Sequence, residues 1–121
     1  MKLDNVGEVI ATRRLFLDGE VAGSTDILVK LGKPQPFPDF ADFYYCPYQI
    51  TGLGDEKVRF ASGIDGFQAI DPAFRAIGID LYLGLNPEVG SRLRWEGDEH
   101  GDLGFPRSPE AGPDPDDSTG T

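Results

Sequence analysis

The sequence contains one cysteine, Cys46, and one histidine, His100. A single cysteine excludes an intramolecular disulfide framework and any zinc or iron–sulfur site that needs several cysteines. A Cys–His catalytic pair would have to combine these two residues, yet neither sequence neighbour of Cys46 would lower the pKa of its thiol. We therefore expect Cys46 to be a reduced, buried structural residue, and we expect no cofactor.

Long apolar runs and common catalytic motifs are also missing. The longest uncharged segment, 43–54, is broken by Pro47 and Gly52, whereas a transmembrane helix needs about 20 mostly apolar residues. Residues 1–5 lack the apolar segment of a signal peptide. The sequence has no Walker motif, no dinucleotide-binding glycine motif and no nucleophile elbow. These absences predict a cytoplasmic, non-enzymatic protein that does not contact a membrane.

Basic residues are in the minority, with 11 Lys and Arg against 21 Asp and Glu, and the net charge is −10. Part of the acidic excess lies in residues 107–121, where Ala111 is the one apolar side chain. Such a segment buries too little apolar surface to offset the entropy lost on ordering. We therefore predict a single folded domain over residues 1–106, followed by a disordered acidic tail over residues 107–121.

Alternating apolar residues predict about five strands. They lie at 8–17, within 21–31, at 42–50, at 57–61 and at 92–96. The dipeptide Asp18-Gly19 favours a hairpin turn between the first two strands. Pro34, Pro36 and Pro38 lack amide hydrogens, so they predict an extended, unpaired connection before the third strand.

Residues 65–84 predict a helix with one apolar stripe that faces the sheet. The stripe consists of Phe67, Ile70, Phe74, Ile77 and Leu81. Asp65 is a suitable N-cap, and Gly84 ends the pattern. Pro72 lies inside it, so the helix either kinks there or restarts with Asp71 as its cap. The predicted order is β-β-β-β-α-β, an α+β fold in which a mostly antiparallel sheet carries one helix on one face.

Four short segments resemble those of a known family. They are Ala11–Leu15 (ATRRL), Pro47–Ile50 (PYQI), Gly52–Arg59 (GLGDEKVR) and Gly101–Pro106 (GDLGFP). Together they resemble segments of small bacterial proteins that are grouped as a domain of unknown function. The resemblance implies a bacterial origin and a single small domain, and it supplies no catalytic residues.

Residues 98–102 bring three carboxylates and His100 together. Hard cations take several oxygen ligands, and histidine suits transition metals. The spacing, however, matches neither an EF-hand loop nor an HExxH helix. We interpret this segment as a solvated acidic loop, with a metal site or a catalytic His100 as the alternatives.

Most basic residues of the predicted strands fall out of phase with the apolar ones. In the strand at 57–61, for example, Val58 and Phe60 are predicted to face the core. Six basic residues then share the outward phase: Arg14, Lys30, Lys57, Arg59, Arg92 and Arg94. Tyr45 faces away from Tyr44 and Tyr48. The pattern predicts one basic outer face, either solvated or able to bind an acidic protein, a phosphate or single-stranded nucleic acid.

These observations leave three functions open. The shortage of catalytic groups favours a non-enzymatic module that binds another protein, in the manner of an immunity or inhibitor protein. The second function is anion or nucleic-acid binding by the basic outer face together with Tyr45. The third is a small ligand-binding protein or enzyme with an aromatic pocket formed by Tyr44, Tyr48 and Trp95. The oligomeric state also stays open.

Overall fold

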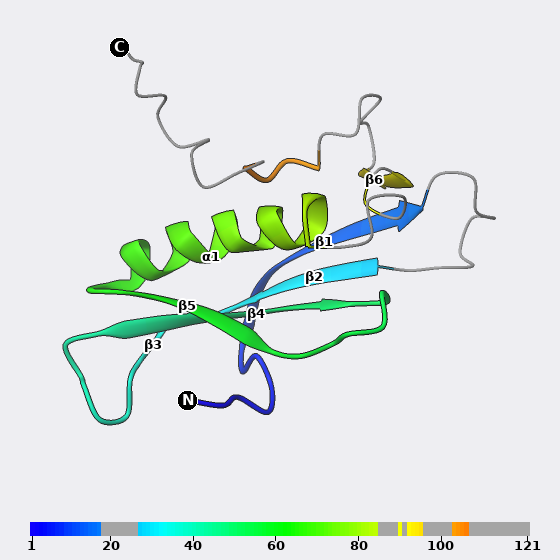
Figure 1. Cartoon of the computed structure of the whole chain (residues 1–121). Coiled ribbons are helices and arrows are strands. Elements are labelled where there is room, and N and C mark those ends of the chain that lie inside the picture. The colour runs from blue at the N-terminus through cyan, green and yellow to red at the C-terminus, as the bar shows by residue number, and fades with distance from the viewer. Residues whose placement is uncertain (18–26, 85–89, 91, 96–102, 107–121) are drawn as a thin grey trace, which may run out of the picture.

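The computed structural model describes residues 1–17, 27–84, 90, 92–95 and 103–106. In Figure 1, strands form one sheet and the helix α1 lies across one of its faces. The strands are β1 (Val9–Leu17), β2 (Ile27–Gly32), β3 (Gln35–Pro36), β4 (Tyr44–Thr51), β5 (Arg59–Gly63) and β6 (Leu93–Trp95), and the helix is α1 (Gly66–Tyr82). The predicted α+β fold, with an antiparallel sheet and a helix on one face, is confirmed.

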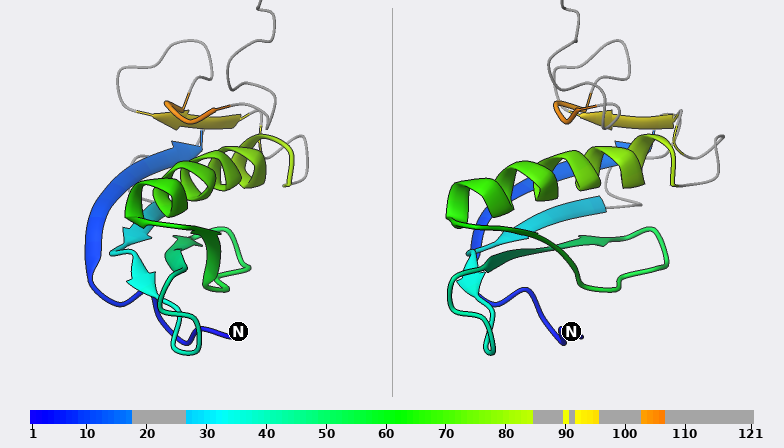
Figure 2. Two further views of the ribbon diagram at one scale, coloured as in Figure 1. Left: turned by 90° about the vertical axis from the view of Figure 1, so that its left-hand side faces the viewer. Right: turned by 60° about the vertical axis from the view of Figure 1, so that its left-hand side comes forward.

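The sheet is an antiparallel meander to which one more strand is added, after the helix, at the edge formed by β1. The strands β1, β2, β4 and β5 pair in chain order, and α1 then carries the chain across the sheet to β6, which pairs with β1. The strands β5 and β6 therefore lie at opposite edges of the sheet (Figure 2). The register of β1 shifts between Val9 and Ala11. This bulge adds local twist, and β1 curves around the helix side of the sheet.

The prediction of an unpaired connection through the three prolines is wrong. Gln35 and Pro36 pair with Tyr45 and Tyr44, and the amide of Phe37 donates to the carbonyl of Phe43 over 2.9 Å. The alternation explains the difference, because every second residue between the prolines keeps its amide hydrogen. The resulting strand β3 continues along the same side of β4 as β2.

The predicted phase of β5 is also wrong. Arg59 pairs with Tyr48, which faces α1, and Arg59 therefore points to the helix side. Phe60 points to the outer face, where its ring lies 6.0 Å from the rings of Phe37 and Tyr45. Both faces of this strand meet apolar neighbours, so its alternation alone does not say which face is the core side.

The core lies between α1 and the inner face of the sheet. Its buried members are Leu15, Ile27, Val29, Cys46, Tyr48, Ala69, Ala73, Ile77, Leu81, Leu93, Leu103 and Phe105. Ile77 and Leu81 are buried as predicted, but Phe67 is 86% exposed and Phe74 is 37% exposed. The helix buries Ala69 and Ala73 instead. Small side chains at these positions allow the helix to lie close to the sheet.

Glycines mark two of the closest approaches of α1 to its surroundings. A Cβ atom at Gly63, the last residue of β5, would lie 2.6 Å from the backbone nitrogen of Ala69. A Cβ atom at Gly78 would collide with the carbonyl oxygen of Pro106. Real Cβ atoms almost never come this close to backbone atoms, so both contacts require glycine.

The helix begins and continues without interruption. Asp65 is its N-cap, as predicted, and its carboxylate accepts from the amide of Gln68 over 2.8 Å. Pro72 lies inside the continuous helix, so the alternative of a restart at Asp71 is wrong. The helix ends beside Gly84, whose amide donates to the carbonyl of Ile79.

Arg13 lies on the inner phase of β1 and is partly buried. Its guanidinium lies 3.9 Å from the ring centre of Trp95, and it donates to the carbonyl of Leu103 over 2.9 Å. Gly104 has a φ of 81°, and a Cβ atom there would lie 2.5 Å from the Arg13 side chain. The ATRRL and GDLGFP segments thus contact each other through Arg13.

Three predictions fall outside the described residues. They concern the hairpin turn at Asp18-Gly19, the acidic segment 98–102 with His100, and the tail at 107–121.

The packing predicts that replacing Ile77 by Ala costs about 2–5 kcal/mol of the free energy of unfolding, because the side chain is fully buried. Replacing Phe67 by Ala should change it by less than about 0.5 kcal/mol, because that ring is exposed. Chemical denaturation of both variants measures the difference. Equal losses would show that Phe67 belongs to the core.

Candidate functional site

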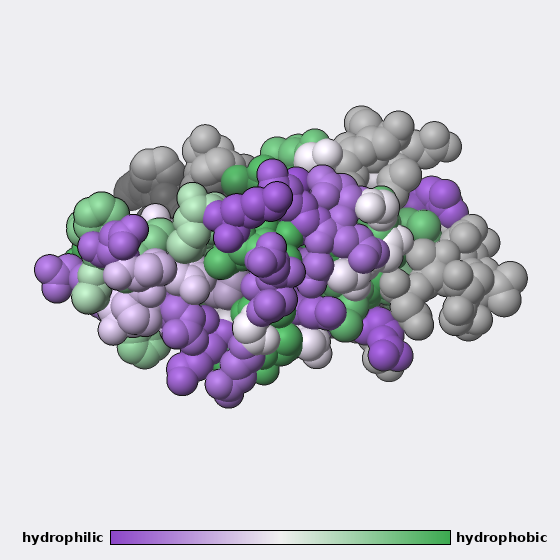
Figure 3. Space-filling view, turned by 90° about the horizontal axis from the view of Figure 1, so that it is seen from below, coloured by the Kyte–Doolittle hydropathy of each residue, from purple (hydrophilic) through white to green (hydrophobic). Residues whose placement is uncertain are grey.

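The predicted basic outer face is formed only in part. Arg14 lies on the outer side of β1, and Thr12 and Phe16, two positions to either side of it, pair with Lys30 and Arg94. These three basic residues therefore share one diagonal of the outer face. Hydrophilic side chains cover the middle of this face (Figure 3).

The other predicted members of this face lie elsewhere. Arg59 faces α1, so its assignment to the outer face is wrong. Lys57 precedes β5 and lines a cavity on the helix side. Arg92 precedes β6. Tyr45 is on the outer face as predicted, with its ring 5.3 Å from that of Phe37.

The loop between β4 and β5 is held by its own polar groups. Gly52 and Gly54 have φ values of 102° and 107°, a region that favours glycine. The side-chain carboxylate of Glu56 accepts from the amide of Gly52 over 3.0 Å. The backbone carbonyl of Glu56 accepts from Nε2 of Gln49 over 2.6 Å. The GLGDEKVR segment is therefore a built turn that places its charged side chains beside the end of α1.

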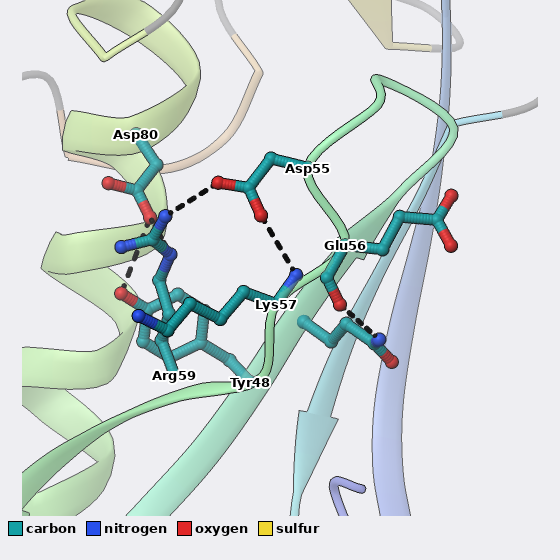
Figure 4. Close-up of polar contacts among 7 residues, drawn as sticks. Tyr48, Asp55, Glu56, Lys57, Arg59 and Asp80 are labelled. Atoms are coloured by element: carbon teal, nitrogen blue, oxygen red, sulfur yellow. Dashed lines mark hydrogen bonds and ion pairs between the residues drawn. The ribbon is translucent and has the colours of Figure 1, made fainter. Parts of the chain in front are cut away.

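This loop borders an open cavity that also lies against β4 and the C-terminal part of α1 (Figure 4). Its volume is about 140 Å³, and we call it the Asp80 cavity. The residues that line it are Tyr48, Ile50, Leu53, Asp55, Lys57, Arg59, Asp80 and Gly84. Two of the family-like segments, PYQI and GLGDEKVR, supply all of these residues except Asp80 and Gly84.

Charged groups face one another across the Asp80 cavity. Asp55 pairs with Nη2 of Arg59 over 3.1 Å and accepts from the amide of Lys57 over 3.1 Å. On the helix, Oδ2 of Asp80 accepts from the hydroxyl of Tyr48 over 3.3 Å and lies 3.9 Å from Nε of Arg59. Figure 4 shows Lys57 and Arg59 extending toward Tyr48 and Asp80.

Burial dominates the ionisation of this cluster. It raises the pKa of Asp80, and the charge of Arg59 and the hydrogen bond from Tyr48 offset the effect only in part. Burial, reinforced by the negative charge of Asp80, raises the pKa of Tyr48 to about 12. Tyr48 is therefore a neutral hydrogen-bond donor at physiological pH, and Asp80 is a carboxylate with incomplete charge compensation.

The sequence did not single out Asp80 or Asp55. Asp80 lies one residue before the buried Leu81 and three residues after the buried Ile77. An acidic residue at the border of an apolar helix stripe is the pattern that could have indicated it.

The residues of the predicted aromatic pocket, Tyr44, Tyr48 and Trp95, do not all line the Asp80 cavity. Tyr48 lines the Asp80 cavity, but neither Tyr44 nor Trp95 does. Trp95 packs on Arg13 at the β1–β6 side of the sheet.

Exposed apolar side chains gather at the opposite end of α1. They are Phe40 and Phe43 of the β3–β4 loop, and Ile64 and Phe67 at the start of the helix. Figure 1 shows that loop and the start of α1 at the same end of the molecule. Tyr44 pairs with Gly63, which brings the neighbouring Phe43 and Ile64 close together. We call these four residues the apolar end.

Three acidic residues lie close in the sequence to members of the apolar end. Asp39 and Asp42 flank Phe40, and Asp65 lies between Ile64 and Phe67; all three are exposed. In the described part of the chain, Asp39 and Asp42 form no ion pair. The apolar end therefore has acidic residues beside its apolar ones in the sequence.

Cys46 is a buried structural thiol. It is fully buried, and its sulfur lies 3.5 Å from the carbonyl oxygen of Gly32, to which the thiol donates. Burial raises the pKa of the thiol to about 11. The reactive thiolate is therefore scarce at neutral pH.

Within the described residues, no three His, Cys, Asp or Glu side chains are placed to hold a metal ion. The helix α1, like any other helical segment in the same residues, falls short of the length and apolar character required to cross a membrane.

The raised pKa of Asp80 predicts a pH-dependent stability. The folded state retains a proton that the unfolded chain releases near pH 3.8, so the contribution of Asp80 to stability falls as pH rises through its folded pKa. Relative to Asp80→Asn, the wild type should lose free energy of unfolding between pH 3.8 and neutrality. Urea unfolding of both proteins across this range tests the sign. A difference that stays constant, or that grows in favour of the wild type, would contradict it.

Comparison with known proteins gives a family and no functional assignment. The searches of curated proteins and of solved structures each found no match. A family profile matches residues 11–107, a span that includes the Asp80 cavity, the apolar end and the Arg13 contacts. The chain belongs to the family described as domain of unknown function DUF6968.

Proposed function

We propose that this domain is a non-catalytic module that binds another protein through its apolar end. The observation that carries the proposal is the presence of four exposed apolar side chains toward one end of a strongly acidic protein. Phe67 is 86% exposed and Phe40 is 64% exposed. Clustered exposed apolar side chains of this kind are typical of interaction sites, and phenylalanine supplies a large apolar contact area.

The acidic residues beside the apolar end indicate what charge a binding partner should carry. Asp39, Asp42 and Asp65 would be brought close to the partner surface when Phe40 and Phe67 are buried. Complementary charge speeds association and disfavours the wrong partner. The proposed partner therefore carries an apolar pocket bordered by Lys and Arg. Nucleic acid is disfavoured at this end, because its phosphates would meet carboxylates.

The test uses the full chain as bait in an extract of its native host, with quantitative mass spectrometry of the bound proteins. The bait variant Phe40→Ser/Phe67→Ser should lose a specific partner about tenfold or more, as expected for central apolar contacts. Its fold should be intact, because both rings are exposed.

Two control baits separate the alternatives. Leu83→Ser alters a side chain that is 65% exposed at the other end of α1, and it should retain the partner. Arg14→Glu/Lys30→Glu alters the outer face and should also retain it. If no bound protein depends on Phe40 and Phe67, the proposal is wrong. If the charge reversal alone abolishes capture, the outer face is the binding surface.

A further inference from the structure

The Asp80 cavity contains polar atoms that the fold does not use. Among the described residues, Nζ of Lys57, Nη1 of Arg59 and Oδ1 of Asp80 form no hydrogen bond or ion pair, although each belongs to a residue that lines the cavity. Oδ1 of Asp80 is also accessible to solvent. Among the described residues, the unpaired side-chain polar atom that is fully buried is Nη1 of Arg75. The cavity therefore offers two cationic donors and one anionic acceptor.

The charges of the cavity cancel. Lys57 and Arg59 balance Asp55 and Asp80. Asp55 is already committed to Arg59 and to the loop backbone, whereas Asp80 meets Arg59 only at 3.9 Å. A simple anion would pair with Lys57 and Arg59 but would be repelled by the nearby carboxylate of Asp80. A simple cation would pair with Asp80 but would be repelled by Lys57 and Arg59. A molecule with both charges matches all of the unused atoms.

We propose that the Asp80 cavity binds a small zwitterion of the α-amino acid type. The ligand carboxylate accepts from Lys57 and Arg59, and its ammonium group donates to Asp80. The short side chain of the ligand lies against Ile50 and Leu53, which are apolar and partly buried. This site is separate from the apolar end, which lies at the other end of α1.

The size of the cavity limits the ligand. One water molecule needs roughly 10–15 Å³ of such space, so about 140 Å³ holds a molecule of several non-hydrogen atoms. A nucleotide or a folded peptide would extend well beyond this volume. The ionisation of the site agrees with this choice, because burial disfavours the charged form of Asp80 and a bound ammonium group would favour it.

The experiment titrates the isotope-labelled full chain with L-alanine and follows the backbone amide resonances by nuclear magnetic resonance. L-alanine should give saturable shifts, in the millimolar range, at residues 55–59 and 80–84. Acetate and methylammonium, which each carry one of the two charges, should bind more weakly by about tenfold or more, because each leaves one charged contact unmade.

Three variants complete the test. Lys57→Met and Asp80→Asn should each weaken L-alanine binding about tenfold or more. Lys30→Met removes a lysine from the outer face and should leave the affinity unchanged. Lys57 is exposed and outside the strands, so its variant keeps the fold even if Asp80→Asn does not.

Three results would overturn the proposal. One is the absence of saturable shifts with L-alanine at these residues. The second is binding that persists unchanged in Lys57→Met. The third is acetate binding as tight as that of L-alanine, which would make the cavity a plain anion site.

Discussion

The close contact of α1 with the sheet depends on small residues. Ala69 and Ala73 face the sheet, and Gly63 meets the helix backbone at its first turns. Gly78 admits the carbonyl of Pro106 farther along the helix. Larger residues at these positions would move the helix outward, since protein interiors have little free space. The rotation of the helix follows from this contact, because the face with the smallest side chains is the one that approaches the sheet.

Both candidate surfaces are consequences of that rotation. At the N-terminal end of α1, it turns Phe67 to solvent, and Phe67 becomes part of the apolar end. At the C-terminal end, it places Asp80 over Tyr48 and within reach of Arg59. The carboxylate is then partly buried, which raises its pKa. One packing constraint thus produces an apolar surface at one end of the helix and a charged cavity at the other.

Local patterns predicted the elements, and long-range contacts decided which way their side chains face. The N-cap at Asp65 and the antiparallel strands follow from short-range chemistry that the sequence displays. Phe67 has the spacing of the predicted helical stripe but is exposed. Spacing alone does not show that a close contact between helix and sheet favours alanine, and Ala69 and Ala73 are buried instead. Arg59 alternates with its neighbours Val58 and Phe60 as a strand residue should. The side of the sheet that it faces depends on its pairing with Tyr48. The Asp80 cavity could not be predicted, because it joins side chains from β4, its loop and α1.

The most direct measurement is the free energy of unfolding of Gly63→Ala beside its control, Gly66→Ala. A Cβ atom at Gly63 would lie 2.6 Å from the backbone nitrogen of Ala69, whereas one at Gly66 meets only the side chain of Pro34 at 3.8 Å. If close packing of α1 fixes the structure, Gly63→Ala loses about 1–3 kcal/mol and Gly66→Ala loses none. If Gly63→Ala is as stable as the wild type, the helix does not depend on this contact and the account is contradicted.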